Sequence, residues 1–292
     1  MYDIFIKKER GFSLDQRFEV IKEELGKPYY EDKDVLLYNM DSIKALKRLK
    51  DKKLVDLTVT SPPYNIGKSY EKVKPLDEYI DWSKEWIKAV YDVTKDKGEF
   101  WLNLGYLKID GIGKAVPISY LLWDKTPFYM IQELVWHYGA GVSARRSLSP
   151  RNEKVLWYVK DPKNYVFNLD SIRDPHVKYP NQKKNGKLKV NSKGKNPSDV
   201  WYIPKVTSGR NRSSKERTKH PAQSPIELFK RLILASSNSE DLVLDPFLGS
   251  GTTCVAAKNL GRKSVGFEVV PEYLDIAIER LNTEKIQQIS LF

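Results

Sequence analysis

The chain has 292 residues, 40% of them hydrophobic, which is enough for one large α/β domain with an insertion or for two domains. No run of about 18 apolar residues and no apolar N-terminal stretch are present, so we expect a cytosolic protein without a membrane span. The single cysteine, Cys254, excludes an internal disulfide, and together with only three histidines it argues against a metal site.

The net charge of +12 is concentrated in one segment. Between Lys178 and Lys219 the chain carries 13 Lys or Arg residues against Asp199 and Glu216, which leaves the rest almost neutral. Such a segment is about as often a solvated loop as a binding site for a polyanion. Aromatic residues that could stack on bases lie within it, namely Tyr179, Trp201 and Tyr202. Their presence favours nucleic acid as a partner.

Residues 1–34 are polar and charged, and they predict a peripheral arm with one amphipathic helix at 15–25. From Val35 onward, strands and helices alternate. The predicted strands of this half cover residues 35–40, 54–60, 98–105, 129–138 and 153–160. The predicted helices cover residues 41–49, 76–94 and 115–126. The alternation is typical of a largely parallel sheet with helices on both faces.

Residues 161–218 predict an irregular insertion, because Pro, Gly, Asn and Lys are frequent there and no period holds. The alternation then resumes. The last elements are helices at 224–237, 252–261 and 271–285 and strands at 241–247 and 263–270. We therefore expect four parts: the arm (1–34), a first half of the α/β domain (35–160), the insertion (161–218) and a second half (219–292).

The stretch LVDLTVTSPPY, residues 54–64, ends a buried strand on a rigid turn. The alternating and β-branched residues of LVDLTVT predict the strand. Pro62 and Pro63 remove two backbone donors and fix two φ angles, so the chain after Ser61 is stiff and extended. A hydroxyl and the aromatic ring of Tyr64 are thus presented at the tip of a strand.

A second motif, LVLDPFLGSGTTCVAAKNLG at residues 242–261, predicts a strand, a glycine turn and a helix. Gly249 and Gly251 allow a sharp turn and the close approach of a ligand. Glu268 follows about 20 residues later, at a strand end where an acidic residue commonly binds ribose hydroxyls. The loop lacks the third glycine of a dinucleotide fingerprint and the Gly-Lys-Ser/Thr of a P-loop. A ligand with an adenosine and no phosphate therefore fits better than NAD or ATP.

With these two motifs the chain resembles S-adenosylmethionine-dependent DNA amino-methyltransferases of the restriction–modification type. SPPY resembles their catalytic motif, DPFLGSGTT their cofactor loop, and KHPAQSP, residues 219–225, the segment before that loop. The catalytic motif precedes the cofactor loop and a basic segment lies between them, which resembles the beta arrangement. The resemblance implies a Rossmann-like α/β methyltransferase fold with circularly permuted motif order, and a target-recognition role for the insertion.

The resemblance also implies the chemistry. The target base is rotated out of the duplex, and its exocyclic amine donates hydrogen bonds to the Ser61 side chain and the Pro62 carbonyl, which localises the nitrogen lone pair. Tyr64 would stack on the base. The predicted catalytic residues are Ser61, Pro62, Pro63 and Tyr64.

Cofactor-binding residues for S-adenosylmethionine carry over in the same way. They are Asp41, His220, Asp245, Pro246, Phe247, Gly249, Ser250, Gly251, Thr252, Thr253 and Glu268. Asp41 and Thr252 could equally be helix caps, and His220 a buried turn histidine bonded to backbone. The predicted DNA-binding residues are Arg145, Arg146, Lys183, Lys184, Arg210, Arg212 and Lys215.

The expected partner is double-stranded DNA, and we expect the cytosolic protein to associate with the nucleoid when it acts. The expected biological role is protection of DNA from a cognate restriction endonuclease, which requires no physical contact with that enzyme, and a homodimer stays open. Serine before Pro-Pro-Tyr is commoner in cytosine-N4 enzymes, although adenine-N6 enzymes with serine exist. A non-catalytic nucleic-acid-binding protein on this fold, and an RNA or protein methyltransferase, are the alternatives. The intact motifs and their order argue against both.

Overall fold

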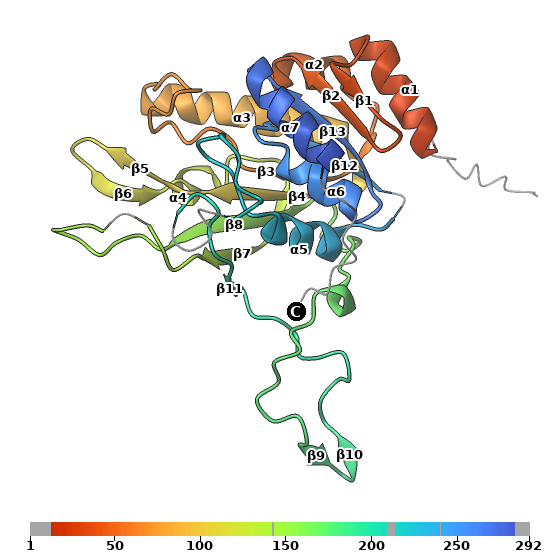
Figure 1. Cartoon of the computed structure of the whole chain (residues 1–292), viewed down its shortest axis with the longest axis vertical. Coiled ribbons are helices and arrows are strands. Elements are labelled where there is room, and N and C mark those ends of the chain that lie inside the picture. Colours follow the sequence, from red (N-terminus) through yellow and green to blue (C-terminus); the bar gives the residue numbers. More distant parts are fainter. Residues whose placement is uncertain (1–12, 142, 209–213, 240, 284–292) are drawn as a thin grey trace, which may run out of the picture.

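The computed structural model describes residues 13–141, 143–208, 214–239 and 241–283. Its main feature is a nine-stranded sheet with strand order β1-β2-β13-β12-β3-β4-β8-β7-β11 (Figure 1). Two further pairs, β5–β6 and β9–β10, form separate hairpins. No described helix is long and apolar enough to cross a lipid bilayer.

The strands are β1 (Tyr30–Glu31), β2 (Val35–Asn39), β3 (Val55–Thr60), β4 (Thr94–Leu104), β5 (Tyr106–Ile109), β6 (Gly113–Pro117), β7 (Tyr129–His137), β8 (Asn152–Val159), β9 (Lys183–Lys184), β10 (Lys187–Leu188), β11 (Val200–Tyr202), β12 (Leu242–Asp245) and β13 (Lys263–Glu268). The helices are α1 (Leu14–Leu25), α2 (Ser42–Arg48), α3 (Leu76–Val93), α4 (Ser119–Leu122), α5 (Ile226–Ser236), α6 (Thr252–Asn259) and α7 (Pro271–Thr283), with a 3₁₀ turn, η1 (Leu169–Ser171).

The centre of the sheet is parallel. Strands β2, β13, β12, β3 and β4 pair in parallel, whereas β8 runs antiparallel between β4 and β7. The chain leaves β12 through α6 toward β13 and leaves β3 through α3 toward β4, so these two connections diverge. In open α/β sheets, ligands bind at the carboxyl ends of the strands beside such a switch point. The predicted α/β architecture is confirmed.

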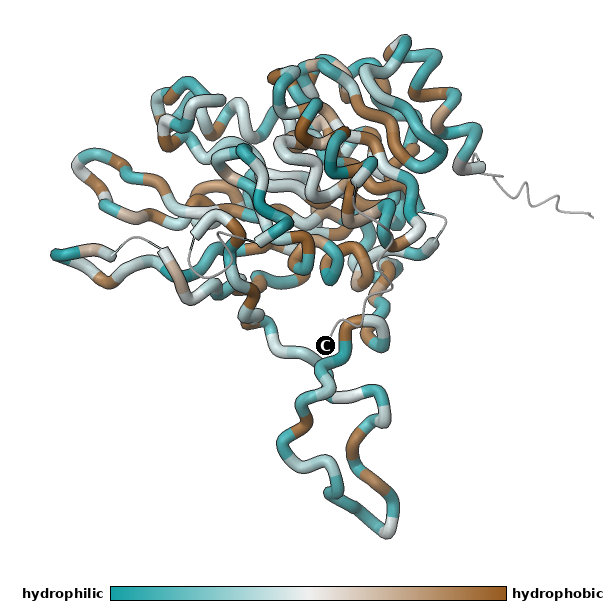
Figure 2. Tube along the Cα trace, in the orientation of Figure 1, coloured by the Kyte–Doolittle hydropathy of each residue, from teal (hydrophilic) through white to brown (hydrophobic). Residues whose placement is uncertain are grey.

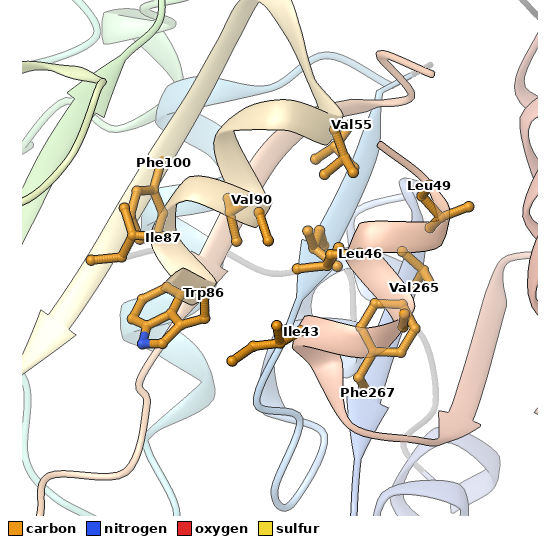
Figure 3. Close-up of a cluster of buried hydrophobic side chains, with 14 of the residues drawn as sticks. Ile43, Leu46, Leu49, Val55, Trp86, Ile87, Val90, Phe100, Val265 and Phe267 are labelled. Carbon is orange, nitrogen blue, oxygen red and sulfur yellow. The ribbon is translucent and has the colours of Figure 1, made fainter. Parts of the chain in front are cut away.

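Helices cover both faces of the sheet because neighbouring strand residues point to opposite sides. Leu36 and Tyr38 belong to the buried cluster that includes α1, α2 and α3, whereas Val35 and Leu37 pack with α6 and α7. Helix α3 buries apolar residues at helical spacing, among them Trp86 and Val90. Figure 3 shows this first cluster, in which side chains of α2 and α3 meet those of the sheet.

Helix α1 is not peripheral, contrary to the sequence-based expectation for residues 1–34. Phe18, Ile21 and Leu25 are buried in the main hydrophobic cluster. The Arg17 guanidinium donates to the Leu54 carbonyl (3.0 Å) and pairs with the Asp56 carboxylate. The amphipathic pattern predicted the helix correctly. The many charged residues suggested a peripheral position, but they lie on the surface face of α1, and its apolar face packs in the main core.

The predicted helix at 115–126 is confirmed at Ser119–Leu122 alone, and its start is wrong. The chain forms strand β6 instead, antiparallel to β5, followed by the one-turn helix α4. Pro117 ends the strand, and the apolar residues that suggested a helix, such as Ile118 and Leu122, are buried around the short turn. One helical turn is enough to bury these side chains, and the residues before it belong to the β5–β6 hairpin.

The insertion at 161–218 is more ordered than its composition suggests. Its residues 200–202 form β11, which extends the main sheet in parallel with β7. Residues 174–195 form an excursion with the β9–β10 hairpin at its tip, and this projects away from the body (Figure 1). Figure 2 shows that most of this projection is hydrophilic. Long-range pairing, which local sequence pattern does not report, creates β11.

The packing of α1 gives a stability prediction. Ile21→Ala should lower the free energy of unfolding by about 2–5 kcal/mol, because it removes a fully buried side chain and leaves a cavity. Glu23→Ala, on the exposed face of the same helix, should change it by less than about 0.5 kcal/mol. Urea unfolding of both variants measures the difference. Equal stability of the two would mean that α1 is detached from the core.

Candidate active site

The two sequence motifs meet at the switch point between β12 and β3. The turn after β3 and the glycine loop after β12 line one cavity of about 490 Å³. The predicted residues that line it are Asp41, Ser61, Pro62, Pro63, Tyr64, His220, Asp245, Pro246, Phe247, Gly249, Ser250, Thr252 and Glu268. Gly251 and Thr253 do not line it. The structure therefore brings most of both predicted sets into one space.

Asp245 ties the two motifs together. Its carboxylate accepts a hydrogen bond from the Thr60 hydroxyl at the end of β3 (2.7 Å) and another from the Thr253 hydroxyl at the start of α6 (2.5 Å). The backbone N–H of Phe247 donates a third (3.1 Å). Burial raises the pKa of this carboxyl, and the three donors oppose the rise. Asp245 thus fixes the spacing between the glycine loop and the Ser61 turn.

The glycine loop needs both of its glycines, each for a different reason. Gly249 has φ +50°, and a Cβ there would lie 3.1 Å from Nε2 of His220. Gly251 has φ +78°, and a Cβ there would lie 2.6 Å from the Cβ of Ala277 on α7. Gly249 therefore leaves room on the side of the cavity, whereas Gly251 allows the loop to pack against α7.

Glu268 ends β13 beside the glycine loop. One carboxylate oxygen accepts the backbone N–H of Gly249 (2.9 Å), and the other accepts those of Val269 (2.9 Å) and Val270 (3.0 Å). Burial raises the pKa of this carboxyl, while the backbone donors act in the opposite direction. The carboxylate is held at the cavity wall with acceptor capacity left over.

His220 packs against the glycine loop at Gly249. Its ring stacks on Tyr70 (centroids 5.9 Å apart) and meets Tyr273 edge-on (4.4 Å). Nδ1 accepts the backbone N–H of Ala222 (3.2 Å). Burial lowers the pKa of His220 to about 4, so the imidazole is neutral at neutral pH. This is the buried, backbone-bonded histidine that the sequence left as an alternative, although it also lines the cavity.

Asp41, Thr252 and Ser250, also predicted for the cofactor site, make contacts that hold the local structure. Asp41 caps α2 by accepting the N–H of Lys44 (2.9 Å). Thr252 donates its hydroxyl to the Ser224 carbonyl (3.3 Å) and accepts from Arg280 (3.0 Å). Arg280 also donates to the Ser250 carbonyl (2.8 Å). These contacts connect the KHPAQSP segment, the glycine loop and α7.

The Ser61 turn leads into a polar network. The hydroxyls of Ser61 and Tyr64 lie 2.8 Å apart, and the Tyr64 hydroxyl also lies 3.0 Å from a carboxylate oxygen of Glu153. The amide of Asn103 donates to Glu153 (2.8 Å) and to the Tyr64 oxygen (2.9 Å). Lys205 donates to the other Glu153 oxygen (2.6 Å).

The sequence analysis missed Asn103, Glu153 and Lys205. Asn103 directly follows the apolar run Phe100–Leu102 near the end of β4, and Glu153 stands just before the apolar run Val155–Val159 of the antiparallel β8; a polar residue beside a buried run was the available signal. Both lie at the carboxyl edge of the sheet, since Asn103 is opposite Val155. Lys205 follows β11 and reaches the same edge only because β11 pairs with β7.

The predicted DNA-binding residues are not gathered in one place. Arg145 and Arg146 are exposed in the connection between β7 and β8, whereas Lys183 and Lys184 form β9 on the separate projection (Figure 1). Lys215 is exposed shortly before His220. Arg210 and Arg212 lie outside the described residues.

The cavity suits S-adenosylmethionine by its own chemistry. Gly249, which has no side chain, borders the cavity. The Glu268 carboxylate lies at the end of the adjacent strand β13, and Phe247 forms part of the wall. A nucleoside with ribose hydroxyls and a flat aromatic base needs such a set.

Comparison with known proteins agrees with this geometry. A DNA methylase family model (N6_N4_Mtase) matches residues 55–279. The chain is 62% identical over 276 residues to the type II methyltransferase M.ScaI of Streptomyces caespitosus, covering 94% of this chain and 90% of that protein. It is 36% identical over 252 residues to the DNA adenine methyltransferase YhdJ of Escherichia coli (strain K12), covering 83% and 81%.

Solved structures share the fold. The cytosine-N4-specific PvuII DNA methyltransferase superposes with a TM-score of 0.68 at 21% identity, covering 91% of each chain. The complex of M1.HpyAVI with S-adenosylmethionine superposes with a TM-score of 0.56 at 26% identity, covering 85% of this chain and 99% of that one. The chain therefore belongs to the family of S-adenosylmethionine-dependent DNA amino-methyltransferases.

Proposed function

We propose that this DNA methyltransferase methylates N4 of a cytosine that is rotated out of duplex DNA, and so protects that DNA from a cognate restriction endonuclease. The observation that carries the proposal is the shared cavity, in which the Ser61 turn faces the glycine loop. A nucleophile and a methyl donor held in one enclosed space react as if at very high concentration.

Ser61 and Pro62 are the proposed acceptors for the target amine. An exocyclic amine is a poor nucleophile because its lone pair is delocalised into the ring. Hydrogen bonds from its N–H groups to the Ser61 oxygen and the Pro62 carbonyl draw that lone pair out of conjugation. Pro62 and Pro63 fix the backbone angles, so neither acceptor has to be ordered when the base arrives.

Tyr64 is the proposed platform for the base. Its hydroxyl is anchored by Ser61 and Glu153, which leaves the ring in a fixed position at the cavity wall. A base rotated out of a duplex loses its stacking neighbours, and an aromatic ring restores about 1–3 kcal/mol of that stacking.

The glycine loop and Glu268 are the proposed binding residues for the cofactor, which when bound supplies an electrophilic methyl group on a sulfonium sulfur. Glu268 accepts hydrogen bonds from the ribose hydroxyls, and Gly249 lets the cofactor lie against the backbone. Phe247 contacts the adenosine. Asp245, Gly251, Ser250, Thr252 and Thr253 act by holding the loop in shape, while Asp41, Pro246 and His220 close the cavity around it.

The choice of cytosine N4 rests on the serine before Pro-Pro-Tyr. Adenine N6 is the second candidate. The 36% identity to a DNA adenine methyltransferase is the observation that favours adenine N6. The test is digestion of duplex DNA to nucleosides after incubation with the protein and S-adenosylmethionine, followed by mass spectrometry. We expect N4-methylcytosine. N6-methyladenine would transfer the assignment to the second candidate, and the absence of both would refute amine methylation.

Loss of the ribose contact should weaken cofactor binding. Glu268→Ala should weaken the binding free energy of S-adenosylmethionine by about 1.5–3 kcal/mol, the scale of hydrogen bonds to a charged group, and so raise the dissociation constant. Isothermal titration calorimetry gives this value directly, with Glu272→Ala on the exposed start of α7 as the control. An unchanged constant in Glu268→Ala would show that this carboxylate only fastens the loop.

The insertion is the proposed target-recognition region. Its projection carries several lysines, and the β7–β8 connection carries Arg145 and Arg146, so two separate basic segments are available to contact a duplex. The proposed division of the chain is an N-terminal part (1–34) whose helix α1 packs on the body, a catalytic half (35–160), the recognition insertion (161–218) and a cofactor-binding half (219–292).

A salt titration tests the projection. Lys183→Ala/Lys184→Ala should weaken binding to specific and random duplexes alike and make the slope of log K against log salt shallower by up to about 1.8, at about 0.9 per phosphate contact. Lys27→Ala/Lys33→Ala, next to the opposite edge of the sheet, is the charge-matched control. The same slope in both double variants would place the hairpin away from DNA.

A further inference from the structure

Among the described residues, Glu153 supplies the carboxylate of the network behind the Ser61 turn, and its side chain is nearly closed off from solvent. Its side chain is 10% exposed. One oxygen accepts from Lys205, and the other accepts from the Asn103 amide and lies 3.0 Å from the Tyr64 hydroxyl. A carboxylate with these partners can only accept hydrogen bonds.

This carboxylate dictates which way the neighbouring hydroxyls point. Burial raises the pKa of Tyr64 well above its usual range, so the phenol keeps its single proton. Two other acceptors lie near the Tyr64 hydroxyl, the Ser61 oxygen at 2.8 Å and the backbone carbonyl of Asn103 at 3.3 Å, and a carboxylate is a stronger acceptor than either. The Tyr64 proton therefore goes to Glu153, and the Tyr64 oxygen becomes an acceptor.

The same logic extends one step further, to Ser61. The Tyr64 oxygen accepts from the Asn103 amide at 2.9 Å and offers its remaining lone pair to the Ser61 hydroxyl at 2.8 Å. Ser61 donates its proton inward to this lone pair. The Ser61 oxygen also accepts from the Asn103 amide at 3.4 Å, which leaves it one lone pair for the cavity and no proton to donate into it.

We propose that Glu153 is a positioning residue that, through Tyr64, makes the Ser61 oxygen an obligate hydrogen-bond acceptor, so that the site selects an exocyclic amine over a carbonyl at the same ring position. An amine donates to this oxygen, whereas the carbonyl of uracil or hypoxanthine meets it acceptor to acceptor. The inference rests on the proposed function, because it assumes that the target amine approaches Ser61.

Replacement of Glu153 by glutamine is a sharp test because the shape is kept. A glutamine amide has one oxygen and one NH₂ group, but the site presents donors on both sides, Lys205 on one and Tyr64 with Asn103 on the other. When the NH₂ group faces Tyr64, the hydroxyl protons of Tyr64 and Ser61 are free to turn toward the cavity. Tyr64→Phe breaks the same chain at its middle and keeps the ring.

The experiment measures binding, without turnover, in the presence of S-adenosylhomocysteine. Two duplexes with the protein's recognition sequence are compared, one with the target base and one with its carbonyl analogue, which is uracil for cytosine or hypoxanthine for adenine. The readout is the ratio of their two dissociation constants. Comparing this ratio between proteins cancels the effect of the altered base on the duplex itself.

We expect the wild-type protein to prefer the amine duplex by about tenfold or more, and Glu153→Gln and Tyr64→Phe each to lose most of that preference. The double variant should lose no more than either single variant, since both interrupt one chain. Glu133→Gln, which removes another strand carboxylate paired with a lysine, should keep the wild-type ratio. Wild-type affinity for the cofactor product in each variant shows that the fold is intact.

A wild-type ratio in both Glu153→Gln and Tyr64→Phe would overturn the proposal, because selection would then not depend on the direction of this chain. An additive loss in the double variant would also overturn it. Failure of the proposed function has a different signature, namely the absence of any methylated amine in DNA treated with the wild-type protein.

Discussion

The buried carboxylate of Asp245 is the contact on which the geometry of the site depends. It accepts hydroxyl protons from Thr60, the last residue of β3, and from Thr253, in the first turn of α6. These residues adjoin the two segments that carry the proposed catalytic and cofactor-binding residues. Because the three side chains are buried, the spacing between the glycine loop and the Ser61 turn is set by the core of the protein. The buried core around the sheet therefore determines the distance between the two sides of the cavity.

The carboxyl edge of the sheet explains why residues so far apart in sequence act together. Parallel strands end at the same edge, which gathers Ser61, Asp245 and Glu268 beside the switch point. The antiparallel strand β8 starts where they end, so Glu153 joins the same row. The pairing of β11 with β7 brings Lys205 of the insertion to Glu153, and this ion pair links the proposed recognition region to the network behind the Ser61 turn.

Sequence alone was sufficient for the parts that local chemistry determines. The strand, turn and helix around Gly249 and the rigid turn at Pro62 are short motifs whose residues need no distant partner to be recognised. The roles of Glu153 and Lys205 depend instead on strand register over long separations, which no local pattern reports. The same limit explains the missed β11 and the reading of α1 as an arm, since burial of Ile21 is a property of the assembled sheet.

The central claim is that cofactor and target base meet across one cavity, with Glu268 at one end and Ser61 at the other. A crystal structure of the protein with S-adenosylhomocysteine and duplex DNA tests it most directly. The account predicts ribose hydroxyls on the Glu268 carboxylate, the cofactor sulfur directed toward the Ser61 oxygen, and one base outside the duplex with its amine between them. A cofactor bound away from Glu268, or a sulfur directed away from Ser61, would contradict it.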